Sequence, residues 1–259
     1  MDYAGDAVSI AELLDERRQL LDVACRMVGS GAEAEGVVDE TYRRWYALSD
    51  TARADIVAPR SWLVTTATGI CLARPVLPDR GEDPAERAPV THSEVLGTAP
   101  AAVPRAMGPA EPGYGALASR ARRWLRARRS RPGTLVRHDA LARAVRAACA
   151  AEDLGRLMSL LSPDATAVFD GGGKIRAMMR PVHGSEQVAR HLLVLLARRP
   201  RTTLRAQSVN GRTGVVVRHD HQVVAIISLG VTGDRVGHVW VVLNPDKLRL
   251  WNRPPTSGW

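Results

Sequence analysis

Residues 10–45 read IAELLDERRQLLDVACRMVGSGAEAEGVVDETYRRW, and this stretch decides the fold of the N-terminal part. Its apolar residues recur at i, i+3, i+4 and i+7, which is the spacing of one buried helix face. Gly29-Ser30-Gly31 interrupts the pattern, so the stretch predicts two helices. The positions expected to be buried are Ile10, Leu13, Leu14, Leu20, Leu21, Ala24, Met27 and Val28 in the first helix, and Ala34, Val37, Val38, Thr41, Tyr42 and Trp45 in the second.

A third helix is predicted to begin at Pro59 and to end before Pro75, because a helix tolerates proline in its first turn but not in its interior. Its expected apolar face consists of Trp62, Leu63, Thr66, Ile70 and Leu72. From residue 75 to 116 prolines and glycines recur without any sustained apolar period. This stretch is predicted to be a linker, since it is too long for an ordinary connection inside a domain. Residues 117–132 are predicted to form an arginine-rich helix.

From residue 133 onward the pattern is that of an α+β domain. Helices are expected at about 139–151, 153–161 and 185–198, and strands at 203–209, 214–219, 223–229 and 236–243, with a further strand ending at Phe169. Turn sequences such as Asn210-Gly211 and Gly233-Asp234 separate the strands. Helices followed by an antiparallel sheet predict a curved α+β cone. The expected domains are a helical domain at 1–74, the linker at 75–116, the arginine-rich helix at 117–132 and the cone at 133–253.

The composition excludes several classes of protein. The chain has 259 residues, of which 45% are hydrophobic, so it can build real cores and is not disordered throughout. Its net charge of +9 is consistent with a polyanionic partner, but only Lys174 and Lys247 are lysines. Such an excess of arginine also follows from a GC-rich genome, so the charge is a weak clue to function.

Targeting and metal-binding signals are not found in the sequence. No apolar run approaches the roughly 20 residues of a membrane helix, and no signal peptide precedes the first helix. The three cysteines are dispersed, which argues against a disulfide framework and against a zinc site. We therefore expect a cytoplasmic protein with no membrane partner, no metal and no cofactor.

Three blocks of the N-terminal part, at 21–30, 34–41 and 59–66, resemble region 2 of extracytoplasmic-function sigma factors. The last part resembles the SnoaL-like, nuclear-transport-factor-2-like domain that is fused to one subgroup of these factors. That match is carried by Asp170-Gly-Gly-Gly-Lys174 and Asn244-Pro-Asp-Lys-Leu248, hereafter the DGGGK and NPDKL strings. The resemblance implies an all-α region 2 domain followed by an α+β cone. It also implies a transcription initiation or regulation protein that docks on RNA polymerase core.

The sequence departs from that family between the two matches. Members carry a complete region 4 helix-turn-helix there, whereas this chain has the linker, and only Leu117–Arg123 resembles the end of a recognition helix. Region 4 is therefore predicted to be degenerate or lost, which would impair promoter recognition. The arginine-rich helix could contact phosphates or lie solvated against a neighbouring domain.

The resemblance also implies three groups of site residues. The surface for RNA polymerase would contain Glu33, Glu35, Asp39 and Glu40, which could equally form a solvated acidic face. Contact with promoter DNA would involve Arg60, Trp62, Thr65 and Thr66, although Trp62 and the threonines could simply pack the helix. Contacts between domains would involve Asp170, Lys174, Asp246 and Lys247, whose strings could equally be a glycine turn and a strand terminator.

An alternative from another class is an enzyme of the cyclase or isomerase type, or a small-molecule sensor, that uses the cone. Its catalytic candidates would be Asp170 and His238, as an acid/base pair converging in an apolar cavity. His238 and Trp240 lie two apart on one strand and could both face inward. The Arg218–His221 run is interpreted as a hairpin tip. A cone filled by side chains would favour the transcriptional interpretation.

Overall fold

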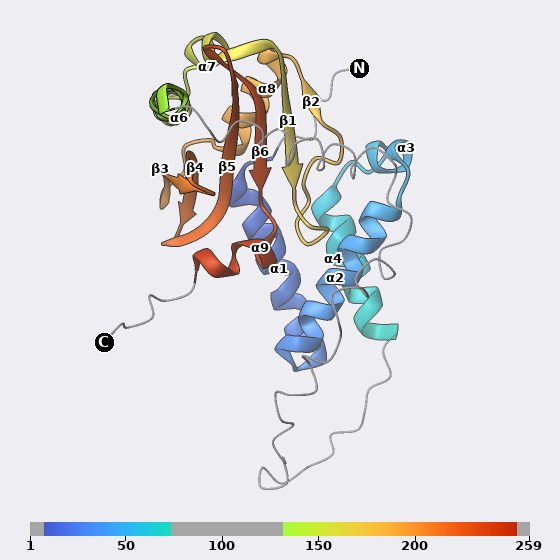
Figure 1. Ribbon diagram of the computed structural model, residues 1–259. Coiled ribbons are helices and arrows are strands. Elements are labelled where there is room, and N and C mark those ends of the chain that lie inside the picture. Colours follow the sequence, from blue (N-terminus) through green and yellow to red (C-terminus); the bar gives the residue numbers. More distant parts are fainter. Residues whose placement is uncertain (1–7, 74–131, 253–259) are drawn as a thin grey trace, which may run out of the picture. The chain divides into compact units, whose positions relative to one another are not determined.

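The N-terminal part is a helical domain in the computed structural model, which describes residues 8–73 and 132–252 (Figure 1). It contains α1 (Ile10–Val28), α2 (Gly31–Ala47), α3 (Asp50–Ala54) and α4 (Pro59–Ala73). Ser9 and Ser30 cap α1 and α2, and Gly29 ends α1 in the left-handed conformation, with φ of 73°. The predicted break between the first two helices and the start of α4 at Pro59 are thus confirmed.

The core of the helical domain lies between α1, α2 and α4. All six positions predicted for α2 are buried, and Leu63 and Ile70 of α4 are buried against them. Met27 and Leu72 were expected to be buried but are exposed. Met27 lies in the last turn of α1, and Leu72 lies on the side of α4 opposite to the buried Leu63. The short helix α3 has no buried residue, which explains why an apolar period does not reveal it.

The C-terminal part is a six-stranded sheet with its three longer helices on one face and the short helix α9 on the other. Its elements are α6 (Pro132–Ala150), α7 (Leu154–Leu160), β1 (Leu161–Asp170), β2 (Val182–His183), α8 (Ser185–Leu195), β3 (Thr202–Val209), β4 (Arg212–His219), β5 (Gln222–Thr232), β6 (Arg235–Val242), α9 (Pro245–Leu248) and the 3-10 turn η4 (Arg249–Trp251). The strand order is β2-β1-β6-β5-β4-β3, in which only β1 and β6 are parallel. Helix α6 begins seven residues before the predicted helix.

The sheet is bent into a cone because its long strands carry irregularities. The register shifts between β4 and β5 and again between β5 and β6, and such bulges bend the strand that contains them. Figure 1 shows β5 and β6 curving along their length. The hairpin turns have the expected positive φ values at Asn210-Gly211 and Asp220-His221, so the Arg218–His221 run is a hairpin tip as predicted.

Each face of the sheet has its own apolar cluster. The main core includes buried residues of α6, α7 and α8 together with Val215, Val217, Val239 and Val241 of the strands. On the other face, Val216 and Ile226 pack with Leu248 of α9 and with Trp251 of η4. The main core fills the inside of the cone with side chains.

The apolar face of α1 is divided between two cores. Leu20 and Ala24 belong to the core of the helical domain, whereas Ile10 and Leu13 belong to the core of the cone. The described residues all belong to one structural unit, which is consistent with a helix that takes part in both cores. The predicted linker and arginine-rich helix lie outside the described residues. In the described ranges, no helix is long and apolar enough to span a membrane.

Candidate functional site

The segment between β1 and β2 joins the cone to the helical domain. Its backbone is bound by Tyr46 of α2, whose hydroxyl donates to the Ile175 carbonyl at 2.5 Å and accepts from the Ala177 amide at 3.0 Å. Arg17 of α1 donates from Nε to the Lys174 carbonyl at 3.2 Å. Three backbone groups of this segment are thus held by side chains of α1 and α2, which fixes it against the helices.

A buried carboxylate lies at the centre of this junction. Glu16 of α1 is only 3% exposed, and Arg176 places its Nε 3.1 Å from Glu16 Oε2. Tyr42 of α2 donates its hydroxyl to Glu16 Oε1 at 3.4 Å. Burial raises the pKa of Glu16 above its ordinary value of 4.5, and the neighbouring Arg176 only partly opposes that shift. Burial likewise raises the pKa of Tyr46 to about 12, so that hydroxyl stays protonated near neutrality.

The two strings singled out in the sequence lie against each other. Lys247 donates to Asp170 Oδ2 at 2.5 Å, and Lys174 Nζ lies 3.1 Å from Asp246 Oδ2. The amides of Leu243 and Asn244 both donate to the Asp170 carbonyl. Each string therefore supplies one carboxylate and one ammonium to the other. Because Lys174 and Lys247 are the only lysines of the chain, both take part in this pairing.

Lys174 also reaches across to the helical domain. Its Nζ lies 3.0 Å from Asp39 Oδ2 on α2, so one ammonium bridges an acid of the cone and an acid of the helices. The two carboxylates raise the pKa of Lys174 in spite of its partial burial. Asp39 Oδ1 is buried and has no hydrogen-bond partner among the described residues. The ion pair with Lys174 therefore offsets most of the cost of burying this carboxylate.

The four acids predicted for the polymerase surface lie on two sides of α2. Successive helix positions advance by about 100°, so Glu33 and Glu40 share one side while Glu35 and Asp39 share another. Glu35 Oε2 pairs with Arg17 at 2.5 Å, which places this second side towards the junction. Glu40 binds Arg43 and Arg44, and the hydrogen bond from Arg44 is the main cause of its lowered pKa.

The predicted DNA residues of α4 also separate into two groups. Trp62, Thr65 and Thr66 share one side of the helix by their i, i+3, i+4 spacing, with Thr65 exposed and the other two half-buried. Trp62 packs its ring edge-on to Trp45, with 5.4 Å between ring centroids. Arg60 lies about 140° around the helix from Thr65 and binds Gln19 of α1.

The predicted acid/base pair does not converge. Thr166 pairs with His238 and Asp170 with Val242 between β1 and β6, so the two candidates are four residues apart along the strands, or about 13 Å. The expectation that His238 and Trp240 both face inward is wrong. Val239 and Val241 occupy the main core, so strand alternation places His238 and Trp240 on the opposite face, where their rings stack at 5.7 Å. In the part of the chain that the structure describes, no three His, Cys, Asp or Glu side chains form a metal site.

Sequence reasoning missed the junction residues Glu16, Tyr46 and Arg176. Glu16 did leave a signal, because it lies three residues after Leu13 and four before Leu20, on the apolar face of α1. An acid in that position needs a buried partner. The sequence of the loop that contains Arg176 does not show that this residue is the partner.

Comparison of the sequence with known proteins finds one match over the N-terminal part and another over most of the chain. Residues 13–74 match the family model for sigma-70 region 2. The extracytoplasmic-function RNA polymerase sigma factor SigJ of Mycobacterium tuberculosis is 28% identical over 297 residues, a match that covers 93% of each chain. The chain is a homologue of the extracytoplasmic-function sigma factors. Its N-terminal part matches sigma-70 region 2, and its C-terminal part is the α+β cone with the strand order given above.

Two solved structures are similar to parts of this sigma factor homologue. The crystal structure of SigJ from Mycobacterium tuberculosis is 26% identical and covers 93% of this chain and 98% of its own, with a TM-score of 0.37. A steroid delta-isomerase from Pseudomonas aeruginosa is 21% identical and covers 43% of this chain and 82% of its own, with a TM-score of 0.33.

Replacing Arg176 with Met is expected to lower the free energy of unfolding by about 3–5 kcal/mol, because it leaves the Glu16 carboxylate buried without its cation. Urea denaturation at neutral pH measures this change. The control is Arg180→Met, which removes an exposed ion pair with Asp50 and is expected to cost at most about 1 kcal/mol. Equal losses in the two variants would contradict a buried role for Arg176.

The double variant Glu16→Leu/Arg176→Met is expected to recover most of that loss, since neither charge is then buried. It should also change the dependence of stability on pH. A raised pKa means that the folded chain binds the Glu16 proton more tightly than the unfolded chain does. Stability therefore falls as pH rises from 4.5 through the folded pKa, and the double variant should lose this component.

Gly172 and Gly173 offer a matched test of the contact between the two strings. Both have positive φ, 62° and 69°, so alanine strains the backbone similarly at either position. A Cβ at Gly172 would lie 2.1 Å from Asn244 Nδ2, whereas a Cβ at Gly173 meets nothing within 4 Å. We expect Gly173→Ala to cost about 1 kcal/mol and Gly172→Ala at least twice as much in urea denaturation. Equal costs would show that the strings do not pack closely in solution.

Proposed function

We propose that this sigma factor homologue docks on RNA polymerase core through the acidic sides of α2, in the cytoplasm, and that the cone at residues 133–253 modulates the docking. The side that carries Glu33 and Glu40 faces away from the helical core, since the buried positions of α2 lie on its other half. Carboxylates gathered on one helix face suit a basic partner surface and speed its association. Glu33 and Glu40 form one side of the proposed docking surface, and Glu35 and Asp39 form the other.

The observation that carries the proposal is the ion pair between Asp39 and Lys174. It connects an acid of α2 to the DGGGK string, and through Asp246 to the NPDKL string. While Lys174 holds Asp39, a basic partner has to compete for that carboxylate. The cone therefore limits docking at the same helix that would bind polymerase.

The size of this effect follows from the exposure of the pair. The side chains of Lys174 and Asp39 are 25% and 33% exposed, so their interaction is comparable with a surface ion pair of up to about 1 kcal/mol. Removing it should therefore change the affinity for polymerase by up to about five-fold. The cone modulates docking on this basis and does not abolish it.

The test is direct binding of the full chain to purified RNA polymerase core, in competition with a housekeeping sigma factor. Lys174→Gln is expected to tighten binding by about two- to five-fold, because it frees Asp39. The matched control is Lys247→Gln, which breaks the pair with Asp170 inside the cone but leaves Asp39 bound, and which should have no such effect. Glu40→Arg is expected to weaken binding, whereas Glu186→Arg on α8 makes the same charge change outside α2.

Two results would contradict the proposal. One is the absence of saturable binding by the unaltered chain at micromolar concentrations, which would remove polymerase as the partner. The other is an equal response to the two lysine variants, which would remove the cone from control of α2 while leaving docking itself intact.

The same proposal assigns contact with a melted promoter strand to α4. Thr65 is exposed beside the half-buried Trp62 and Thr66, and this side offers hydroxyls and an aromatic edge to a single strand. Arg60 supports the contact from the flank of α4 next to Gln19. Promoter selection would be restricted, because only Leu117–Arg123 of the sequence resembles part of the family's region 4.

Thr65→Asp is expected to lower the affinity of the polymerase complex for a single-stranded promoter oligonucleotide by about ten-fold, because it places a negative charge beside the phosphates. Fluorescence anisotropy of the labelled oligonucleotide measures the affinity. Ser159→Asp makes the same charge change at an exposed position of α7 in the cone and serves as the control. If both variants bind the oligonucleotide alike, α4 does not contact the strand.

A further inference from the structure

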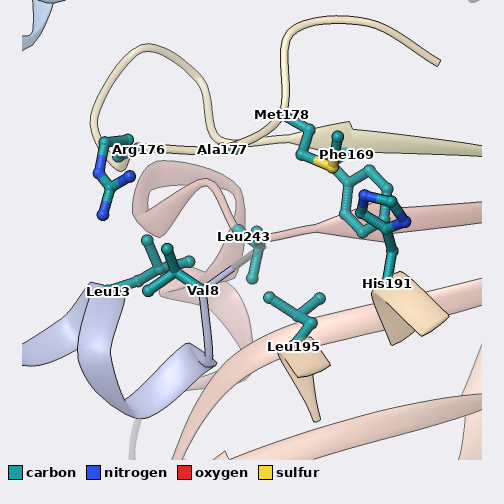
Figure 2. Close-up of a pocket in the computed structure, with 9 residues that line it drawn as sticks. All are labelled: Val8, Leu13, Phe169, Arg176, Ala177, Met178, His191, Leu195 and Leu243. Carbon is teal, nitrogen blue, oxygen red and sulfur yellow. The ribbon is translucent and has the colours of Figure 1, made fainter. Parts of the chain in front are cut away.

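The inside of the cone leaves little room for a partner. The cavity drawn in Figure 2 lies between Arg176 and the rings of Phe169 and His191, and its volume of about 20 Å³ holds about one water molecule. The main core occupies the rest of the interior. On the outside, the cone has an edge at β3, which ends the sheet and pairs with β4 as its one neighbour among the described strands (Figure 1).

The pairing of β3 with β4 determines which backbone groups face this edge. Asn210-Gly211 is a two-residue turn with positive φ, so the flanking pair Val209–Arg212 exchanges both of its backbone hydrogen bonds. Bonded and non-bonded pairs then alternate along the strand. The amide of Thr202, a non-bonded position, donates away from β4 to the Arg199 carbonyl, as this alternation requires. The other residues whose N–H and C=O groups face the edge are Leu204, Ala206 and Ser208.

The cone carries the positive charge of the described chain. Residues 132–252 contain 17 Lys and Arg against 9 Asp and Glu, whereas residues 8–73 contain 7 against 10. A genome-wide bias towards arginine acts on both parts alike, so it does not explain this difference. Arginines gather at the start of β3, where residues 198–205 read RRPRTTLR.

One of these arginines lies directly at the edge. Arg205 is exposed and is paired in register with Val216, so it shares the face of the sheet on which α9 packs. Arg218 of β4 lies opposite Thr203, which makes it a diagonal neighbour of Arg205 at about 7–8 Å. No carboxylate of the described residues pairs with either guanidinium. The edge therefore combines unbonded backbone groups with uncompensated positive charge.

These two features together define what can bind here. Two copies of β3 paired antiparallel would bring their Arg205 side chains opposite or diagonal to each other, and like charges in those positions are destabilising. Nucleic acid offers phosphates to the arginines but no row of main-chain donors and acceptors to the edge. An extended peptide with carboxylates on alternate residues offers both.

We propose that the cone binds an extended acidic segment of a partner protein, which adds to the sheet as a strand beside β3. Its main chain bonds to the outward groups of Leu204, Ala206 and Ser208, and a carboxylate opposite Arg205 pairs with that guanidinium. The next carboxylate along the segment lies opposite Thr203, one strand away from Arg218. This surface is separate from α2 and α4, so it does not depend on docking to polymerase.

Hydrogen exchange of the full chain tests the edge. In the free chain the amides of Arg205 and Gln207, which bond to β4, are expected to exchange slowly, and those of Leu204, Ala206 and Ser208 rapidly. A capped peptide of sequence Thr-Val-Glu-Val-Glu-Val-Thr should slow the second group. If these three amides are already slow in the free chain, the edge is not available and the proposal fails.

Fluorescence anisotropy of the labelled peptide measures its affinity for the full chain. Arg205→Glu is expected to weaken binding about ten-fold, because it places like charges opposite each other. Ala206→Pro should weaken it similarly, since proline removes an outward N–H without breaking a bond to β4. The matched control is Arg156→Glu, the same charge change at an exposed position of α7, which should leave the affinity unchanged within about two-fold.

Three results would overturn the proposal. The first is no saturable binding of the glutamate peptide, and the second is equal binding of the same peptide with lysine in place of glutamate. The third is weaker binding in Arg205→Glu with full binding in Ala206→Pro, which would show attraction of polyanions such as nucleic acid without addition of a strand. Because polymerase is absent from these experiments, none of the three results bears on docking through α2.

Discussion

The buried pair of Glu16 and Arg176 is the interaction on which the junction of this chain depends. Glu16 lies on α1 between Leu13, which belongs to the cone, and Leu20, which belongs to the helical core. A carboxylate in that position has lost its hydration, and the cation that compensates for it comes from the cone. Helix α1 is therefore stable in its observed place only when both domains surround it.

Apolar burial adds to this constraint and outweighs the ion pairs at the edge of the junction. Withdrawing Ile10 and Leu13 from the cone would expose two aliphatic side chains, at about 1.5–3 kcal/mol each. A partly exposed pair such as Lys174–Asp39 contributes about 1 kcal/mol at most. Loss of the Lys174 contact can thus make Asp39 of α2 more accessible to a partner, but it cannot separate the cone from the helices.

Local signals in the sequence predicted the helices, strands and turns better than they predicted which parts of the chain pack against each other. The buried face of α2, the glycine that ends α1 and the hairpin turns all follow from spacing and from the conformational freedom of particular residues. Periodicity states which side chains are buried but not against what, so it could not show that the face of α1 serves two cores. Strand alternation likewise defines two faces without saying which is inside, and this is why His238 was wrongly expected to face the core. The family resemblance grouped four acids on α2, whereas the helical phase separates them into two sides.

The division of α1 also determines which perturbation could reach the helical domain from the cone. Breaking an ion pair at the surface leaves Ile10 and Leu13 buried, so the start of α1 stays in place. Withdrawing the first turn of α1 costs more, because Val8 and Leu13 would then lose their apolar contacts with the cone. A perturbation that reaches the helical domain through α1 must therefore overcome this apolar contact, and the helix then transmits it to Glu16 and its partner Arg176.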